Sequence, residues 1–375
     1  MKPIVAISAL LAATPALAGT AVVAPLGTNA KGEVVDAITL TNRAGMRVVI
    51  LTRGGAIAEV SVPDRAGKLT NVVLTRPDFD AWDRGGSFNT LIGRFANRIS
   101  GGGFTIDGQR FALPANPETG ITIHGGTSQT GGGWGTKLWA ARSFQTATTA
   151  GVALSLNSPD GDNGFPGAMA VTATYTLNDA NELRIDWRAT TTRPTHVNVT
   201  NHTYFNLGGH GSAPIDAHRL RLHASRYTPS SERNLPTGVI AAVAGTPFDF
   251  QQEKPIGPAL RSSHPHMLNT KGLDHNFVVD GAPGTLRPAA ELVDPVSGRR
   301  LAISTTEPGM QVYTANGFNG SQAAAGGLML RQGDGIAVET QHFPDTPNRP
   351  EFPSTLLRPG ETFLSSTVFA FGVVK

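Results

Sequence analysis

The stretch HVNVTNHTYFNLGG, residues His196 to Gly209, is the most informative for the fold because its side chains alternate between apolar and polar types. Side chains of a β-strand point to opposite faces in turn, so this pattern predicts a strand with one face on a core. The apolar face would hold Val197, Val199, Thr203, Phe205 and Leu207. The opposite face would hold His196, Asn198, Thr200, His202, Tyr204 and Asn206. A solvated strand face more often carries Lys, Glu, Arg and Ser, so this polar face is expected to serve a binding site.

Alternation of the same kind extends along the chain. It occurs in Met46 to Leu51, Ala170 to Leu177, Glu182 to Ala189, His218 to Ala224, Gly335 to Phe343 and Thr362 to Val374. The 44 glycines and 26 prolines are scattered between these segments, as in strands joined by turns, and Asp107-Gly108 is a strong hairpin signal. No repeat of fixed period suggests a propeller or a β-helix. The predicted fold is all-β, a single large antiparallel β-sandwich over residues 19–375.

The N-terminus resembles a secretory signal. A lysine at position 2, a short apolar run and the sequence Ala16-Leu17-Ala18 are its three parts, and the apolar run is too short to span a bilayer. We therefore predict a signal peptide over residues 1–18, cleavage near Ala18, and a periplasmic or secreted protein with no membrane attachment afterwards.

The amino-acid composition and the absence of certain motifs exclude several classes of function. The chain has no cysteine, which excludes disulfides, thiolate nucleophiles and Cys-based metal sites. The formal net charge is only +3 and no run of Lys and Arg forms a basic stripe, so no nucleic-acid partner is expected. There is no G-x-S-x-G motif for a serine nucleophile, and Gly67-Lys68 and Gly101 to Gly103 match no phosphate or dinucleotide motif. His264 and His266 have the spacing of zinc ligands, but an exposed loop is the interpretation we adopt, and no metal ligand is assigned.

Other strands repeat the pattern of one apolar and one polar face. Glu339 and Gln341 lie opposite Ile336 and Val338, and Gln311 points away from Met310 and Val312. His124 precedes two glycines, which would allow another group to approach closely. A single strand histidine or glutamate is usually solvent-facing, and Asp274 could simply cap a turn. Together, however, imidazole, amide and carboxylate groups beside aromatic rings suit a neutral polyol.

Seven ordered segments resemble the aldose 1-epimerase, or galactose mutarotase, family. They are GRFANRI (93–99), FTIDG (104–108), HGG (124–126), SPDGDNGFPG (158–167), NHTYFNL (201–207), LDHNF (273–277) and ETQHFPD (339–345), the last followed by NRPEFP (348–353). The matches run in family order to Leu357-Arg-Pro-Gly-Glu361 and cover most of the chain.

The resemblance implies a large β-sandwich enzyme that interconverts the α and β anomers of free aldoses without metal or cofactor. It assigns the general acid to His202 and the general base to Glu339. It assigns contacts with the sugar to Asn97, Arg98, His124, Asp274 and Gln311. A protonated His202 facing an ionised Glu339 would stabilise both charges, and such a pair predicts a bell-shaped pH profile.

Some alternatives stay open at this point. Asp274 and Glu339 are the two carboxylates that glycosidic bond cleavage would need. A sugar-binding protein without catalysis would carry a similar polar face, and a sugar-phosphate epimerase would need more cations than Arg94 and Arg98. The glycine-rich segment from Thr127 to Gly135 departs from the family pattern. We interpret it as a loop beside the site, so the preferred sugar is not predicted. The expected partner is a free monosaccharide, and the protein is expected to be a monomer or a homodimer.

Overall fold

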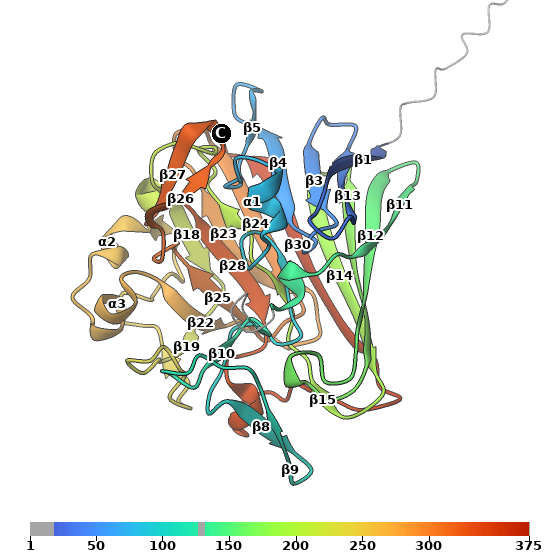
Figure 1. Ribbon diagram of the computed structural model, residues 1–375. Helices are drawn as coiled ribbons and strands as arrows, with labels where there is room; N and C mark the ends of the chain where they lie inside the picture. The colour runs from blue at the N-terminus through green and yellow to red at the C-terminus, as the bar shows by residue number, and fades with distance from the viewer. Residues whose placement is uncertain (1–18, 127–131, 375) are drawn as a thin grey trace, which may run out of the picture.

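The computed structural model describes residues 19–126 and 132–374, and Figure 1 shows them as layers of β-strands. The predicted all-β class is confirmed. The helices of the described part are short, and none is long and apolar enough to cross a membrane. The α-helices are α1 (Phe79–Asp83), α2 (Gly257–Leu260) and α3 (Pro265–Thr270), and the other helical segments are single 3-10 turns. The predicted signal peptide, residues 1–18, lies outside the described residues.

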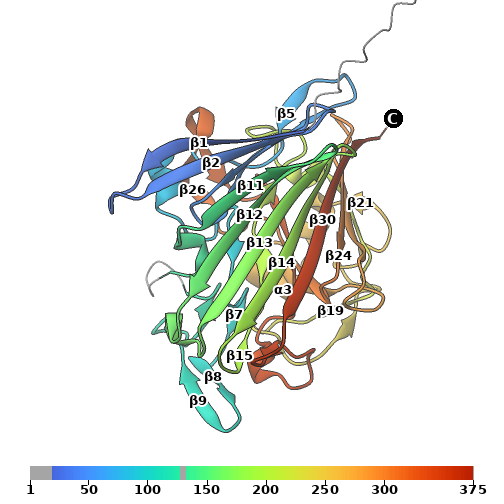
Figure 2. The same ribbon diagram turned by 90° about the vertical axis from the view of Figure 1, so that its right-hand side faces the viewer.

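The largest sheet has nine strands, and Figure 2 shows most of them side by side. Their order is β11 (Ala140–Gln145), β12 (Thr149–Ser158), β13 (Met169–Asn178), β14 (Glu182–Thr191), β30 (Phe363–Val373), β24 (Arg299–Thr305), β23 (Arg287–Val293), β18 (Arg219–Leu222) and β21 (Lys254–Pro255). The alternation predicted around residues 170–177 is confirmed, because every second residue of β13 is buried. One face of this sheet therefore packs on the core.

A six-stranded antiparallel sheet packs against the same core. Its order is β17 (Tyr204–Phe205), β28 (Ile336–Gln341), β25 (Gly309–Tyr313), β22 (Asp274–Val278), β19 (Arg226–Thr228) and β20 (Ala241–Ala242). Ile336, Val338, Met310 and Val312 join the main hydrophobic cluster. All six residues of β28 are nevertheless buried, so its opposite, polar face is also covered.

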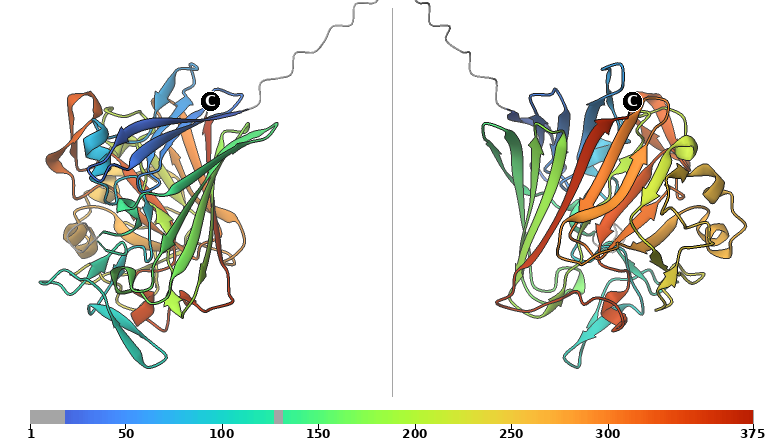
Figure 3. Two further views of the ribbon diagram at one scale, coloured as in Figure 1. Left: turned by 45° about the vertical axis from the view of Figure 1, so that its right-hand side comes forward. Right: turned by 180° about the vertical axis from the view of Figure 1, so that it is seen from behind.

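A five-stranded sheet closes one end of the core, and its first two strands lie across β11 and β12 (Figure 3). It runs in sequence order through β1 (Thr20–Thr28), β2 (Val34–Thr41), β3 (Arg47–Leu51), β4 (Ile57–Pro63) and β5 (Leu69–Asn71). Two-stranded pairs complete the described strands: β6 (Leu91–Ile92) with β16 (Thr200–Asn201), β7 (Arg98–Ile99) with β10 (Thr122–Ile123), β8 (Gly103–Ile106) with β9 (Gln109–Ala112), β15 (Thr195–His196) with β29 (Leu356–Leu357), and β26 (Asn319–Ala324) with β27 (Leu328–Arg331).

The prediction of one continuous strand over residues 196–209 is wrong. The segment forms three short strands, β15, β16 and β17, and each pairs with a different partner: β29, β6 and β28. Apolar and polar residues alternate here because both faces of the segment are buried. Val197 and Phe205 lie in the core, and Asn198 on the polar face is also fully buried. A segment that changes partners every few residues keeps its side-chain pattern without forming one regular strand.

Two local predictions have different outcomes. Asp107 and Gly108, with φ of 49° and 80°, join β8 to β9 as a hairpin, as predicted. The expected exposed loop at residues 264–266 is instead the start of helix α3, where His264 Nδ1 accepts a hydrogen bond from the His266 backbone N–H. Among the described residues, no third potential ligand completes a metal cluster with these two histidines.

Candidate active site

The polar face of the six-stranded sheet brings sequence-distant residues together. Gln311 of β25 pairs directly with Glu339 of β28, and Asp274 of β22 pairs with Tyr313 of β25. Directly paired residues of antiparallel strands project from the same face, so these side chains gather on one surface. The apolar residues between them hold the opposite face on the core.

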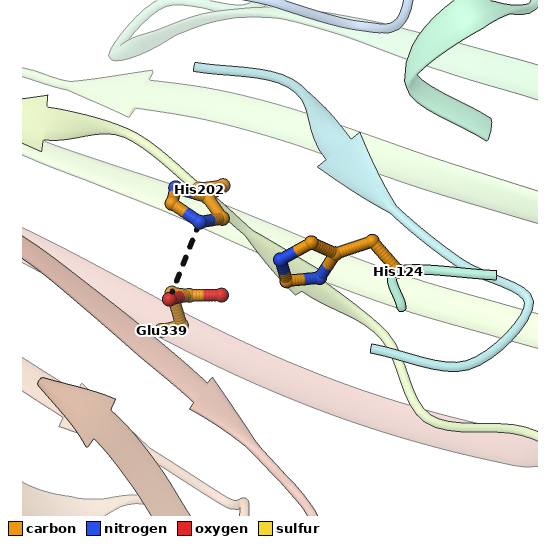
Figure 4. A group of neighbouring side chains, drawn as sticks. All are labelled: His124, His202 and Glu339. Atoms are coloured by element: carbon orange, nitrogen blue, oxygen red, sulfur yellow. Dashed lines mark ion pairs between the residues drawn. The ribbon is translucent and has the colours of Figure 1, made fainter. Parts of the chain in front are cut away.

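His202 reaches Glu339 from the link between β16 and β17, the strand next to β28. Tyr204 of β17 pairs with Ala337, so His202, two residues earlier, lies level with Glu339. Figure 4 shows the ion pair between the two side chains. His202 Nε2 is 3.5 Å from Glu339 Oε1, and the side chains are 5% and 2% exposed. His124 lies beside this pair, and its ring meets that of His202 edge to face with the centroids 5.2 Å apart. The predicted acid and base therefore meet in one buried group.

His124 is positioned by an exchange of bonds with Asn97. The backbone N–H of Asn97 donates to His124 Nδ1 at 3.2 Å, and the backbone N–H of His124 donates to the Asn97 carbonyl at 2.9 Å. His124 Nδ1 is thus an acceptor, so its neutral ring carries the proton on Nε2. Gly125, with φ of 71°, lies so near the Gly93 carbonyl that a Cβ would stand 2.2 Å from its oxygen. The predicted close approach at this glycine is therefore made by backbone.

Arg98, Asp274 and Gln311 form a network beside the acid–base pair. Arg98 Nη2 lies 3.0 Å from Asp274 Oδ2, and Gln311 Nε2 donates to Asp274 Oδ1 at 2.6 Å. Arg98 Nη1 also donates to Asn97 Oδ1 at 3.1 Å. With both carboxylate oxygens of Asp274 engaged, the network fixes the positions of the groups that the sequence assigned to sugar binding.

These side chains surround a cavity of about 370 Å³, at the small end of the range usual for ligand sites. Of the seven residues predicted from the sequence, six line it: Asn97, Arg98, His124, His202, Asp274 and Glu339. Gln311 does not line it; it lies behind Asp274, along a small adjoining cavity. Among the described residues of the cavity wall, sequence reasoning missed Ser87, Thr136 and Tyr313. Tyr313 follows two residues after Gln311 in the same alternation, which is the signal that could have identified it.

The polar face of residues 196–209 contributes less to the cavity than expected. Only His202 and Tyr204 of that face line it. Asn198 and Asn206 donate instead to backbone carbonyls, and His196 contacts Thr355 and the ring of Phe104. Most of this face therefore supports the fold, which corrects the expectation of an extended binding surface.

The glycine-rich segment divides into two parts. Residues 127–131 lie outside the described residues, whereas Gly133, Gly135 and Thr136 line the cavity. Trp134 between them is 1% exposed and packs in the core with Trp139 and Trp187. A loop was expected throughout, but the indole anchors this end of the segment.

Burial determines the protonation of the pair. It raises the pKa of Glu339 well above its ordinary value, and the nearby charge of Asp274 adds to this effect. It lowers the pKa of His202 to about 4 and that of His124 well below its ordinary value. Burial alone would also raise the pKa of Asp274, but Arg98 and Gln311 lower it below the ordinary value. Burial thus opposes the charged His202–Glu339 pair expected from the sequence, while Asp274 stays ionised.

The pair nevertheless holds one proton over a wide pH range. A protonated histidine beside a carboxylate and a neutral histidine beside a carboxylic acid have the same net charge and differ only in where the proton lies. Either form contains one proton donor and one proton acceptor. Two groups that face one cavity and exchange one proton are suited to moving protons on a bound hydroxyl compound.

His124, His202 and Glu339 are also residue types that ligate metals, and their ligand atoms lie within 4.8 Å of one another. The geometry would admit an ion, although acid–base chemistry requires the same closeness. The expectation of chemistry without metal or cofactor therefore stays a prediction.

Comparison with known proteins places this arrangement in a wider group. The family model described as "Aldose 1-epimerase" matches residues 36–370. Galactose mutarotase of Rattus norvegicus is 39% identical over 329 residues, which cover 88% of this chain and 92% of the relative. Aldose 1-epimerase of Escherichia coli (strain K12) is 33% identical over 344 residues, covering 91% and 96%. The crystal structure of galactose 1-epimerase from Lactobacillus acidophilus NCFM superposes with a TM-score of 0.84 at 30% identity, covering 95% of this chain and 100% of that one.

The fold and the buried pair define an antiparallel β-sandwich protein with an acid–base site on its six-stranded sheet. Within that class, the chain belongs to the aldose 1-epimerase family.

Proposed function

We propose that the protein is an aldose 1-epimerase, which interconverts the α and β anomers of free aldoses such as D-galactose and D-glucose. The observation that carries the proposal is the 3.5 Å separation of His202 Nε2 and Glu339 Oε1 on the wall of the cavity. Anomer exchange needs one proton donor and one proton acceptor on the same ring, and this pair supplies them.

The reaction follows from two proton transfers. Glu339 removes the proton of the C1 hydroxyl, and His202 gives a proton to the ring oxygen as the bond between C1 and that oxygen breaks. The C1 carbonyl forms, and rotation about the C1–C2 bond presents its other face. His202 then takes the proton back from the attacking hydroxyl while Glu339 returns one to the carbonyl oxygen. Each positioned transfer is worth about 10²–10⁴-fold.

Burial favours the state in which the ring is open. After ring opening Glu339 carries the proton and His202 is neutral, which is the distribution that burial favours for both groups. The enzyme need not stabilise two buried charges while the open-chain aldehyde turns. The ionised Asp274, held by Arg98, accepts hydrogen bonds from sugar hydroxyls, and Arg98, Asn97 and His124 provide donors.

The alternative functions fit less well. Glycosidic bond cleavage would use Glu339 as the acid and Asp274 as its ionised partner, and the pKa shifts of the two groups suit those roles. The relatives named galactose mutarotase and aldose 1-epimerase favour anomer exchange over this alternative. Arg94 is unavailable to a sugar phosphate, because its guanidinium donates to the carbonyls of Pro166 and Gly167 and to the Ser158 hydroxyl.

A measurement of the exchange between the two anomers at equilibrium distinguishes a catalyst from a protein that only binds sugar. Saturating the anomeric proton signal of α-D-galactose or α-D-glucose by NMR should transfer saturation to the β signal only when enzyme is present. A sugar-binding protein would broaden the signals without transfer, and a bond-cleaving enzyme would release reducing sugar from an oligosaccharide. Either result would reject the proposal.

We infer that residues 1–18 direct export, so that the mature chain acts in the periplasm or outside the cell. The three-part pattern of the N-terminus supports this. Mass spectrometry of the protein from fractionated cells should find a chain that begins after Ala18; a full-length chain retained in the cytoplasm would contradict the inference.

The oligomeric state is a separate question. Light scattering on the same material decides between a monomer and a homodimer.

A further inference from the structure

A second cavity of about 260 Å³ adjoins the catalytic one. The two share Gly86, Ser87, Tyr204 and Tyr313 as common wall. The second cavity is completed by Arg76, Gly85, Phe88, Gly317, Phe318 and Gln322. It is therefore an extension of the sugar site and not a separate feature of the surface.

Arg76 is the unusual residue of this cavity. Its guanidinium lies over the ring of Phe88, 4.2 Å from the centroid, and it forms no hydrogen bond or ion pair with any residue in the described ranges. Partial burial, together with the like charge of Arg84, lowers the pKa of Arg76. A partly buried cation without a counter-ion is costly, and an incoming anion would remove that cost.

The charge of the cavity wall supports an anionic ligand. Arg76 is the only charged residue among the residues that line this cavity in the described part of the chain. The catalytic cavity, in contrast, contains the carboxyl groups of Asp274 and Glu339 beside Arg98. An acid group would be attracted to the second cavity and repelled from the acid–base pair.

Aromatic rings connect the cation to the reaction centre. Phe88 stacks on Tyr204 with centroids 5.5 Å apart, and Tyr204 lies 5.0 Å from the ring of His202. Phe318 and Tyr313 stand beside Tyr204 at 4.9 and 6.1 Å. Because Phe88, Tyr204 and Phe318 are only 5%, 5% and 7% exposed, they form a rigid wall behind the cavity. The side chains of Ser87, Gln322 and Arg76 supply hydrogen-bonding groups for a sugar unit. The volume suits a whole sugar unit better than a single carboxylate.

We propose that this cavity is a second subsite for an acidic sugar unit joined to the aldose, and that Arg76 binds its carboxylate. The fitting substrate class is a reducing disaccharide whose non-reducing unit is a uronic acid. The inference rests on the proposed function, since the reducing unit occupies the catalytic cavity. A planar guanidinium binds a carboxylate through two parallel hydrogen bonds, which gives Arg76 the role of a specificity-determining residue.

The test compares two disaccharides with the same reducing glucose. Cellobiose carries a neutral glucosyl unit, and β-1,4-glucuronosyl-glucose differs from it only by a carboxylate. Polarimetry should give the native protein a kcat/KM for the acidic disaccharide about 10- to 100-fold above that for cellobiose. Arg76→Gln should remove this preference without changing the rate on glucose, Arg76→Lys should keep part of it, and 0.5 M salt should reduce it.

Arg110→Gln is the matched control, because Arg110 is an exposed arginine on the β8–β9 hairpin and should not affect the preference. Equal rates on the two disaccharides with native protein, or a preference that survives in Arg76→Gln, would overturn the inference while activity on glucose stands. Absence of any activity on glucose and galactose would overturn the proposed function, and the inference with it.

Discussion

The Nε2 atom of His202 lies 3.5 Å from Oε1 of Glu339, and both side chains are almost completely buried. This distance is longer than an ordinary hydrogen bond, so the two groups are close enough to titrate as a unit and far enough apart for each to contact a sugar oxygen.

The pH profile of kcat/KM should be bell-shaped with a wide plateau. Its acid limb should lie near pH 4, because burial lowers the pKa of His202 to about 4, and below that pH both groups carry protons. The alkaline limb should follow the raised pKa of Glu339, above which the pair has no proton to donate. Brief exposure to each pH, with recovery measured at pH 7, separates titration from unfolding. An acid limb centred near 6.5, the value of a free imidazole, would contradict the account.

Asp274→Asn should reduce kcat/KM by about 10- to 100-fold, since it removes the charge that Arg98 contacts and that, in the proposed function, accepts a hydrogen bond from a sugar hydroxyl. The effect should appear in both KM and kcat, because the substrate is held and oriented less well. Asp186→Asn is the control: it breaks an Asp–Arg pair with Arg184 on an exposed strand face and should leave kinetics unchanged. Similar losses in both variants would show that activity depends only on general stability.

Removal of metal ions should leave the catalytic rate unchanged. His124, His202 and Glu339 are close enough to ligate an ion, but acid–base chemistry requires their lone pairs and protons for the sugar. Dialysis against EDTA should therefore leave the rate of mutarotation unchanged. A loss that Zn²⁺ or Mn²⁺ restores would show that the three groups form a metal centre instead.

Acid should destabilise the folded protein between about pH 6.5 and pH 4. Burial lowers the pKa of His218 from 6.5 to about 4, so its contribution to the free energy of unfolding is complete above pH 6.5 and is lost as pH falls through that range. The loss is on the order of 3 kcal/mol for this residue. His218 Nε2 accepts from the Leu207 backbone N–H at 3.0 Å, a bond that protonation of Nε2 would break.

His218→Gln keeps a hydrogen-bond acceptor but does not titrate, so it should make the free energy of unfolding, measured in urea at several pH values, fall less steeply with acid. An unchanged slope would mean that other groups account for the acid sensitivity. His196, whose pKa burial also lowers to about 4, is the next candidate.

The alternation of apolar and polar residues along the sequence was enough to predict that the fold is built from β-strands. Alternation in β13 and β14 matches the burial of their side chains, and the Asp107-Gly108 hairpin follows from turn chemistry. The pattern failed for residues 196–209, because alternation reports burial and cannot show that three successive partners divide the segment. Trp134 shows the same limit: its glycine neighbours indicated a loop, whereas tertiary packing buries the indole.

The sequence predicted those residues of the site that belong to a recognisable motif. Motifs predicted that His202 and Glu339 share one site, and the register of β17 and β28 explains why they meet on the cavity wall. Their catalytic roles stay a prediction. The positions of Tyr313 and Arg76 on the cavity walls could not be predicted, since they depend on which segments the fold brings together there. Gln311 was identified, but only the structure shows that it acts on Asp274 from behind the cavity wall.

The most direct test is polarimetry of freshly dissolved α-D-galactose and α-D-glucose with native protein, Glu339→Gln and His202→Asn. We expect native protein to speed the approach to the same final rotation, and each variant to lose about 10²–10⁴-fold of that acceleration. The double variant should be little worse than either single one, because the two groups act as one unit. A native protein that leaves both rates at the buffer value, or folded variants that keep native rates, would contradict the central claim.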